Sequence, residues 1–257
     1  MITALLYIFG SVLLVSLIAV IGILPIHLRK KQSEHLLIFL LSISVGTLLA
    51  TVFIHFLPEA TSHGYTLGVA STVLGGFLAF FLLEKLIHWH HHKKDEESMG
   101  HSHAYHLAPI NLIGDGVHNF IDGLVIAGSY LADINIGIAA TVSVIFHELP
   151  QEIADYGVLL YSGLSRKKAL LLNFLSALTA VLGAIVGVLL YQLMHSFNAF
   201  LLPFAAGNFL YIAASNLVPQ LHRHCGLKET VLHIIAILIG VGIMVALVFV
   251  GPGHVHG

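Results

Sequence analysis

Two stretches of the chain gather side chains whose types and spacing could bind a metal ion. In the first stretch, Asp115, His118, Asn119 and Asp122 follow one another at i, i+3, i+4 and i+7. An α-helix places residues at this spacing on one face. The stretch therefore predicts a row of carboxylate, imidazole and amide groups along one helix.

The second stretch lies further along the chain and has the same character. His147, Gln151 and Asp155 form one helical row, and Glu148 and Glu152 lie beside it. Polar residues could simply join two helices, but two histidines, two amides and five carboxylates across both stretches exceed what such a contact needs. Imidazole and carboxylate together suit Zn²⁺, and also Fe²⁺, Mn²⁺, Co²⁺ or Ni²⁺.

Other metal chemistries fit the sequence less well. Cys225 is the single cysteine, so clusters of thiolate ligands are excluded. Mg²⁺ and Ca²⁺ prefer sites made only of oxygen, which the histidines argue against. Pro150 removes one helical hydrogen bond and frees the carbonyl group of Phe146, which adds a further candidate ligand.

An intramembrane metalloenzyme is an alternative, because His147-Glu148 begins like the HExxH motif of zinc proteases. That motif requires a second histidine four residues after the first, and position 151 is glutamine. We therefore do not expect an enzyme.

The elements that carry these stretches are predicted to cross a membrane. Of the 257 residues, 57% are hydrophobic and only 9% are charged, whereas soluble domains have about 25% charged residues. Segments this apolar and long are expected to be helices, because a helix satisfies its own backbone groups in lipid. The eight predicted spans cover residues 2–24, 36–57, 66–88, 108–131, 136–161, 169–194, 199–221 and 230–251.

The basic residues support this count and give the spans an orientation. All 11 lysines and arginines fall on one side of the predicted membrane, so both termini are expected outside the cytoplasm. His118 and His147 then lie roughly 15 Å from the ends of their spans, at the bilayer midplane. We predict an all-α protein that forms a single polytopic domain over residues 1–257.

Spans two and seven end in similar motifs, His-Phe-Leu-Pro-Glu at 55–59 and Asn-Leu-Val-Pro-Gln at 216–220. The first motif lies at the outer side and the second at the inner side. This relation predicts an inverted repeat in which spans one to three and six to eight enclose spans four and five, a 3+2+3 arrangement. Capping of helix ends would also explain each motif residue by itself. The candidate pathway residues are His55, Glu59, Asp115, Asp155 and Asn216.

The third connection, residues 89–107, is predicted to be a histidine-rich cytoplasmic loop. Seven of the 19 histidines lie between His88 and His106. Such biased tracts are typically disordered and bind metal weakly. We expect this loop to buffer metal or provide feedback, not to conduct ions.

The two metal-binding stretches resemble those of the ZIP (Zrt-, Irt-like) metal transporters, in particular their histidine-rich subfamily. The resemblance rests on His-Asn-Phe-Ile-Asp-Gly at 118–123 and His-Glu-Leu-Pro-Gln-Glu at 147–152, together with the eight spans and the histidine-rich third connection. It implies zinc uptake into the cytoplasm, with Fe²⁺, Mn²⁺, Cd²⁺ or Co²⁺ as poorer cargo. It also implies that one helix bundle moves against another. No cofactor is expected besides the transported ion.

The resemblance implies a primary and a secondary metal site, formed by His118, Asp122, His147 and Gln151, and by Asn119 and Glu148, respectively. Gln151 departs from many relatives, which have histidine or glutamate there, and a neutral amide does not offset the repulsion between two dications. The carboxylate that some bacterial members place in span six is also missing here. We therefore expect one tightly held ion, which Glu152 could reach only if the kink at Pro150 turns it inward.

Two further interpretations remain open. A cation exporter of the six-span type would need a cytoplasmic metal domain, and none follows the last span. A non-transporting metal sensor could be distinguished only by measuring flux. The expected partners are the divalent metal ion and the lipid bilayer, without nucleic acid, and a homodimer is left open. Short connections and the lack of a signal sequence favour a prokaryotic inner membrane.

Overall fold

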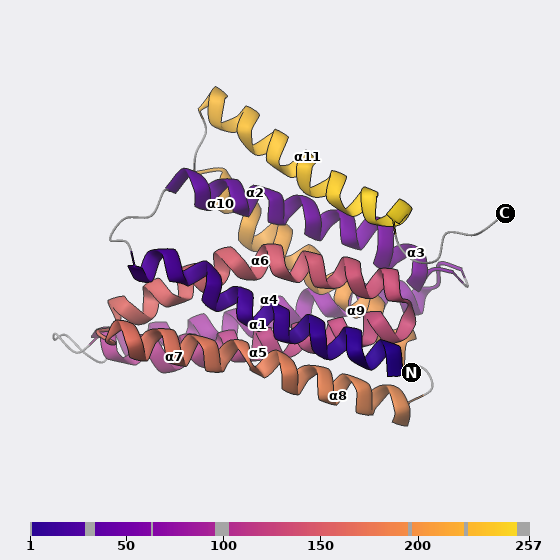
Figure 1. The fold of residues 1–257 in the computed structure, drawn as a ribbon, viewed down its shortest axis with the longest axis horizontal. Helices are drawn as coiled ribbons and strands as arrows, with labels where there is room; N and C mark the ends of the chain where they lie inside the picture. Colours follow the sequence, from indigo (N-terminus) through magenta and orange to yellow (C-terminus); the bar gives the residue numbers. More distant parts are fainter. Residues whose placement is uncertain are drawn as a thin grey trace.

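The computed structural model describes residues 2–28, 34–62, 64–95, 103–194, 197–223 and 226–250, and these residues form helices joined by short turns. In chain order the elements are α1 (Ile2–Leu28), α2 (Glu34–Ala50), η1 (Thr51–Phe56), α3 (Leu57–Ala60), α4 (Leu67–Asp95), α5 (His103–Ala132), α6 (Ile134–Tyr161), α7 (Arg166–Ala177), α8 (Thr179–Leu193), α9 (Phe197–Tyr211), η2 (Ile212–Leu217), α10 (Val218–Leu221) and α11 (Leu227–Val250), with η1 and η2 as π-helical segments. Figure 1 shows a bundle of long helices. The predicted all-helical fold is confirmed for the described residues.

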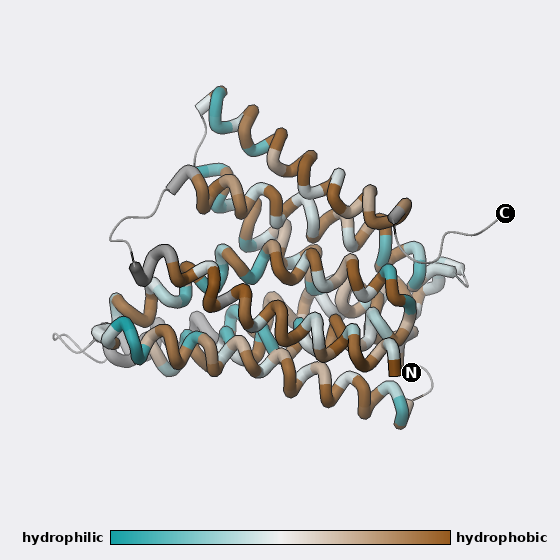
Figure 2. Tube along the Cα trace, viewed as in Figure 1, coloured by the Kyte–Doolittle hydropathy of each residue, from teal (hydrophilic) through white to brown (hydrophobic). Residues whose placement is uncertain are grey.

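Within the described residues, six stretches have the length and composition of a membrane span: Ile2–Leu24, Leu36–Ala60, Leu67–Leu86, Arg166–Leu193, Ala199–Leu221 and Leu227–Phe249. The other two long helices, α5 and α6, have 30 and 28 residues and carry the polar stretches. Both pack against several neighbours, α5 against α6, α8 and α9, and α6 against α1 and α2. Apolar residues follow one another along most helices in Figure 2. The two helices that carry the polar stretches thus lie among apolar ones.

A single residue, Asp133, joins α5 to α6 and folds them into a tight hairpin. Its backbone is extended, and its side chain accepts hydrogen bonds from the backbone N–H groups of Asn135, at 2.7 Å, and Ile136. Such a cap satisfies donors that the first turn of a helix leaves free. The two metal-binding stretches are therefore held side by side within one hairpin.

Glycines allow several helix pairs to approach closely. A side chain on Gly46 of α2 would collide with the Ile237 carbonyl of α11, and one on Gly240 of α11 would collide with the backbone of α2. The pair α4 and α9 meets in the same way, because a side chain on Gly76 or Gly207 would run into the backbone of the other helix. Small residues at such contacts let the backbones pack directly, as in other membrane bundles.

Two helices of the bundle are built to the same plan. In α2–η1–α3 and in α9–η2–α10, a long α-helix passes into a six-residue π-helical segment and then into a short helix that contains a proline. Pro58 and Pro219 lack the N–H group that would continue the hydrogen-bond ladder, and a π-helical turn absorbs this break. His55 and Asn216 occupy equivalent places, each in the π-helical segment three residues before its proline.

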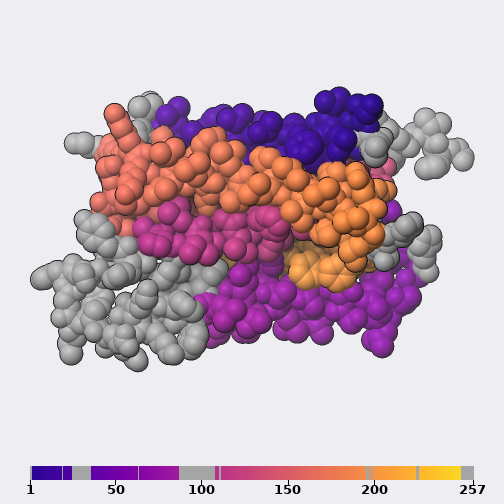
Figure 3. All heavy atoms as spheres, turned by 90° about the horizontal axis from the view of Figure 1, so that it is seen from below, coloured from indigo at the N-terminus to yellow at the C-terminus, as the bar shows by residue number. Residues whose placement is uncertain are grey.

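The helices next to the histidine-rich segment are longer than predicted. Helix α4 continues to Asp95 and α5 begins at His103, so much of the expected loop 89–107 extends these two helices. Residues 96–102 lie outside the described part of the chain. In the space-filling view of Figure 3, α1, the pair α7–α8, α5 and α4 form successive bands across one face.

Candidate metal site

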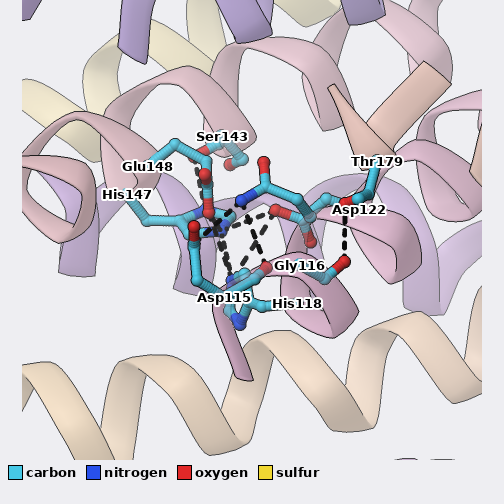
Figure 4. A network of polar contacts seen from close by, with 9 residues as sticks. Asp115, Gly116, His118, Asp122, Ser143, His147, Glu148 and Thr179 are labelled. Atoms are coloured by element: carbon cyan, nitrogen blue, oxygen red, sulfur yellow. Dashed lines mark hydrogen bonds and ion pairs between the residues drawn. The ribbon is translucent and has the colours of Figure 1, made fainter. Parts of the chain in front are cut away.

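Two histidines and two carboxylates meet where α5 and α6 face each other (Figure 4). The Nε2 atom of His147 lies 3.0 Å from Oδ2 of Asp122 and 3.3 Å from Nε2 of His118. The Nε2 atom of His118 lies 3.3 Å from Oε1 of Glu148. One ligand atom from each of the four residues lies within 4.8 Å of all the others. This arrangement could hold one metal ion through two nitrogens and two oxygens.

These four side chains are almost completely removed from solvent. Asp122, His147 and Glu148 are at most 1% exposed, and His118 is 13% exposed. In the described part of the chain, Oδ1 of Asp122 and Oε2 of Glu148 are buried without a hydrogen-bond partner, and Oε1 of Glu148 contacts only the two histidines. A buried carboxylate without a partner is costly unless a proton or cation neutralises it. The site therefore favours binding of a cation.

The orientation of His147 supports the same conclusion. Its Nδ1 atom lies 2.9 Å from the backbone carbonyl oxygen of Ser143, so Nδ1 carries the proton and donates it to that oxygen. In the neutral ring, Nε2 then presents a lone pair toward Asp122 at 3.0 Å. A lone pair facing a carboxylate oxygen is unfavourable unless a cation or a second proton lies between them. Metal-binding histidines are commonly oriented by such a hydrogen bond from the other ring nitrogen.

Aromatic rings pack directly against the two histidines. Phe80 of α4 meets His118 with 5.7 Å between ring centroids, and Phe209 of α9 meets His147 at 5.8 Å. Phe209 also packs against Phe56 of η1, at 5.4 Å, and both phenylalanines are fully buried. These rings lower the local polarity, which strengthens electrostatic attraction between the carboxylates and a cation.

A second group of carboxylates adjoins the first and shares Glu148 with it. One oxygen each from Asp115, Glu148 and Glu152 lie within 4.8 Å of one another, and all three residues are buried. The amide nitrogen of Asn119 donates to Oδ1 of Asp115 at 2.9 Å. Asp115 and Glu152 each keep one buried oxygen without a hydrogen-bond partner.

A cavity of about 350 Å³ leads away from His118. Its lining includes Asp115, Asp155, Gln151 and Asn216, together with Glu84, Asn111 and Gln220 and apolar residues. Asn111 lies in the first part of α5, and Gln220 lies in α10 at the end of its span. The cavity therefore runs from the histidines toward the end of the bundle that is predicted to face the cytoplasm.

The candidates His55 and Glu59 lie away from this cavity lining. His55 is buried, and its Nε2 lies 3.3 Å from the backbone carbonyl oxygen of Met244. Glu59 is exposed in α3. The Phe146 carbonyl that Pro150 frees accepts a 2.5 Å hydrogen bond from the hydroxyl group of Ser44. This hydrogen bond joins α6 to α2.

Sequence reasoning missed one polar contact of the site. The amide nitrogen of Asn173, on α7, donates to Oε2 of Glu152, and both side chains are buried. Helix α7 returns along α6 after a short turn in which Gly163 has φ = 84°, a conformation that favours glycine. The only signal in the sequence is a lone asparagine within a predicted apolar span.

Comparison with known proteins finds relatives that are named zinc transporters. A protein-family model described as "ZIP Zinc transporter" matches residues 2–110 and 105–248. The chain is 31% identical to "Zinc transporter zipt-7.2" of Caenorhabditis elegans, over 86% of this chain and 60% of that protein. It is 30% identical to "Zinc transporter YKE4" of Saccharomyces cerevisiae, over 84% of this chain and 72% of that protein.

A third relative, "Zinc transporter ZIP13" of Danio rerio, is 28% identical over 81% of this chain and 75% of that protein. The chain thus spans 60% of the worm protein's length and about three quarters of the fish and yeast proteins. These relatives come from animals and a yeast, so they give no support to the prokaryotic inner membrane expected from the sequence.

Proposed function

The chain belongs to the ZIP zinc transporter family, and we propose that it carries zinc, or a similar divalent transition metal ion, across a membrane into the cytoplasm. Members of this family are transporters, not enzymes. The observation that carries the proposal is the buried group of His118, Asp122, His147 and Glu148 between the facing helices α5 and α6. Two neutral imidazoles and two carboxylates match the charge and the ligand preference of Zn²⁺.

We propose that α5 and α6 are two further spans, so that eight helices cross the membrane in a 3+2+3 arrangement with both termini outside. The same order of α-helix, π-helical segment and proline-containing short helix in α2–η1–α3 and α9–η2–α10 supports an inverted repeat. The glycine contacts support it further, because Gly46 and Gly207 each lie nine residues before the equivalent residues His55 and Asn216. The side on which the basic residues lie supports the orientation.

The path that we propose is closed on the outer side of the histidines and open on the inner side. On the outer side, the rings of Phe56 and Phe209 pack together, and the hydroxyl groups of Thr51 and Ser143 lie 2.6 Å apart. On the inner side, the cavity reaches His118 directly. An ion held by the four ligands would therefore leave toward the cytoplasm, and entry would require one helix group to move against another.

The proposal is tested by metal uptake into vesicles that contain the purified chain, with Zn²⁺, Fe²⁺, Mn²⁺, Co²⁺ and Cd²⁺ offered separately. We expect uptake of Zn²⁺ by the wild type and loss of uptake in His147→Ala. His233→Ala is the matched control, because His233 is also a buried histidine but lies on α11 outside the site. Binding of zinc without any flux would indicate a metal sensor instead of a transporter.

A further inference from the structure

Three fully buried hydroxyl side chains follow one face of α2 and η1, at Ser44, Thr47 and Thr51. Their spacing of i, i+3 and i+7 places them on the same side of the helix, and we call them the hydroxyl row. Two of them contact α6, which packs along α2. The Oγ atom of Ser44 lies 2.5 Å from the carbonyl oxygen of Phe146, and Oγ1 of Thr51 lies 2.6 Å from Oγ of Ser143.

The carbonyl group of Phe146 depends on this row for a donor. Pro150 lies four residues later and has no N–H group to donate to it, and a buried carbonyl group without a donor costs free energy. The single proton of the Ser44 hydroxyl group can go either to this carbonyl or to the Leu40 carbonyl of its own helix, at 2.8 Å. Ser44 therefore keeps an acceptor if α6 moves away, whereas the Phe146 carbonyl needs another donor.

Thr47 is the next hydroxyl group along the row, toward the outer side in the proposed orientation. In this structure it donates to the Ser44 carbonyl of its own helix, at 3.0 Å. Three residues of an α-helix rise by about 4.5 Å. A shift of α6 by that distance along α2 would therefore bring the Phe146 carbonyl from Ser44 to Thr47. Shifts of about one helical turn are one way in which packed helices change between two arrangements.

Resting on the proposed function, we propose that the hydroxyl row holds α6 at two positions along α2. Ser44 and Thr51 hold it while the outer side is closed, and Thr47 holds it when the site opens outward. The carbonyl group of Ser143 accepts the hydrogen bond that orients His147, so the two positions of α6 are also two positions of the metal site. The row acts through α6 as a set of positioning residues and determines the balance between these positions.

Ala139 of α6 provides a reporter for the outer position. It is fully buried and packs with Ala50 of α2 and Met244 of α11, and an outward shift of α6 would carry it past them. Ala139→Cys is combined with Cys225→Ser in the full chain, and alkylation by a water-soluble maleimide is measured in detergent. If the two positions exchange faster than alkylation occurs, the rate is proportional to the population of the outer position, even when that population is small.

Substitutions in the row should change this rate in opposite directions. Ser44→Ala removes the donor used at the inner position, so the rate should rise by about fivefold or more, the usual effect of one hydrogen bond. Thr51→Val should act in the same direction. Thr47→Val keeps the shape of the side chain but removes the donor used at the outer position. The alkylation rate and the maximal rate of Zn²⁺ uptake in vesicles should then both fall by about fivefold or more. General loosening of the helices would instead raise the alkylation rate in every variant.

Two substitutions serve as matched controls. Ser42→Ala removes another fully buried hydroxyl group of α2, which donates to the Ile38 carbonyl of its own helix and lies on the side opposite to Ser44. It should leave the alkylation rate and the uptake unchanged. Thr47→Ser keeps the donor and should behave like the wild type. If Thr47→Val does not fold, Thr47→Ala removes the same donor and should lower both rates.

An unchanged or higher alkylation rate in a folded Thr47→Val or Thr47→Ala protein would overturn the inference. An unchanged rate in a folded Ser44→Ala protein would overturn it as well. Absence of Zn²⁺ uptake by the wild type would instead count against the proposed function, while the alkylation rates would still show whether the hydroxyl row holds α6 at two positions.

Discussion

The Nε2 atom of His147 on α6 lies 3.0 Å from Oδ2 of Asp122 on α5, and neither side chain is more than 1% exposed. The other ring nitrogen of His147 donates to a backbone carbonyl group. A lone pair and a carboxylate oxygen therefore face each other in a buried place. Both groups are strong ligands for Zn²⁺. Because they lie so close together, a bound cation would stabilise the protein relative to its metal-free form.

The first prediction concerns the charge of Asp122. Asp122→Asn keeps the shape of the side chain but removes a buried negative charge, so the metal-free protein should be as stable as the wild type or more stable. Zinc at about 100 times its Kd should stabilise the wild type by about 2.7 kcal/mol, and most of this gain should be lost in the variant. Thermal unfolding in detergent, with and without zinc, measures both effects.

Ser129→Ala provides the control for this prediction, because Ser129 is buried on the same helix but does not belong to the site. It should keep the stabilisation by zinc. If Asp122→Asn were stabilised by zinc as strongly as the wild type, Asp122 would not be a ligand.

The second prediction concerns Gln151, which lines the cavity together with His118. Gln151→Glu adds a negative charge near the bound dication, so zinc should bind about tenfold more tightly, which is about 1.4 kcal/mol. A more tightly held ion leaves more slowly, so the maximal uptake rate should fall. Zinc-binding titration and uptake kinetics measure these two changes.

Gln220→Glu is a matched control, since it makes the same change of charge in the same cavity but near the end of the bundle. Its effect on zinc affinity should be clearly smaller. Equal effects of the two substitutions would mean that the charge acts through the whole cavity and not at the histidines.

The third prediction uses two neighbouring glycines of α4. Gly76→Ala should destabilise the protein by about 1–3 kcal/mol, because the new Cβ atom would overlap the backbone of α9 at Phe204. Gly75→Ala meets open space and should be neutral or should stabilise the helix by up to ~1 kcal/mol. Thermal unfolding of the two variants tests the contact between α4 and α9, and similar melting temperatures would contradict it.

The fourth prediction concerns the histidine-rich segment. Because α4 reaches Asp95 and α5 begins at His103, deletion would shorten two helices, so substitution is the cleaner change. Serine should replace the histidines at His90, His91, His92, His101 and His103. We expect normal zinc uptake at low external metal and altered uptake only at high metal. Loss of uptake at low metal, in a folded protein, would make the segment part of the conduction path.

The sequence was sufficient to predict the helices and to predict that the two polar stretches face each other. Apolar length predicts a helix in lipid, and the spacing around His118 and around His147 predicts one polar face on each helix. Among the described residues, however, length and composition identify six candidate spans, and α5 and α6 are not among them because their polar side chains lower their mean hydropathy. The residues that form the site therefore keep α5 and α6 from meeting a criterion based on the length of an apolar segment.

Contacts between distant helices could not be predicted in this way. Ser44 on α2 lies 102 residues from Phe146, whose carbonyl it binds, and no spacing in the sequence relates the two. Asn173 reaches Glu152 only because α7 folds back along α6. Helical periodicity gives the face on which a residue lies, whereas the partner across that face depends on how the whole bundle packs.

The one-residue link at Asp133 has a consequence for how an ion could be carried. Because α5 and α6 form one hairpin, the distances among His118, Asp122 and His147 are internal to a single folding unit. Any rearrangement that exposes the site to the other side of the membrane can then leave the coordination sphere intact. The cargo would keep its ligands while the barrier around it changes sides, and it would lose them only on release.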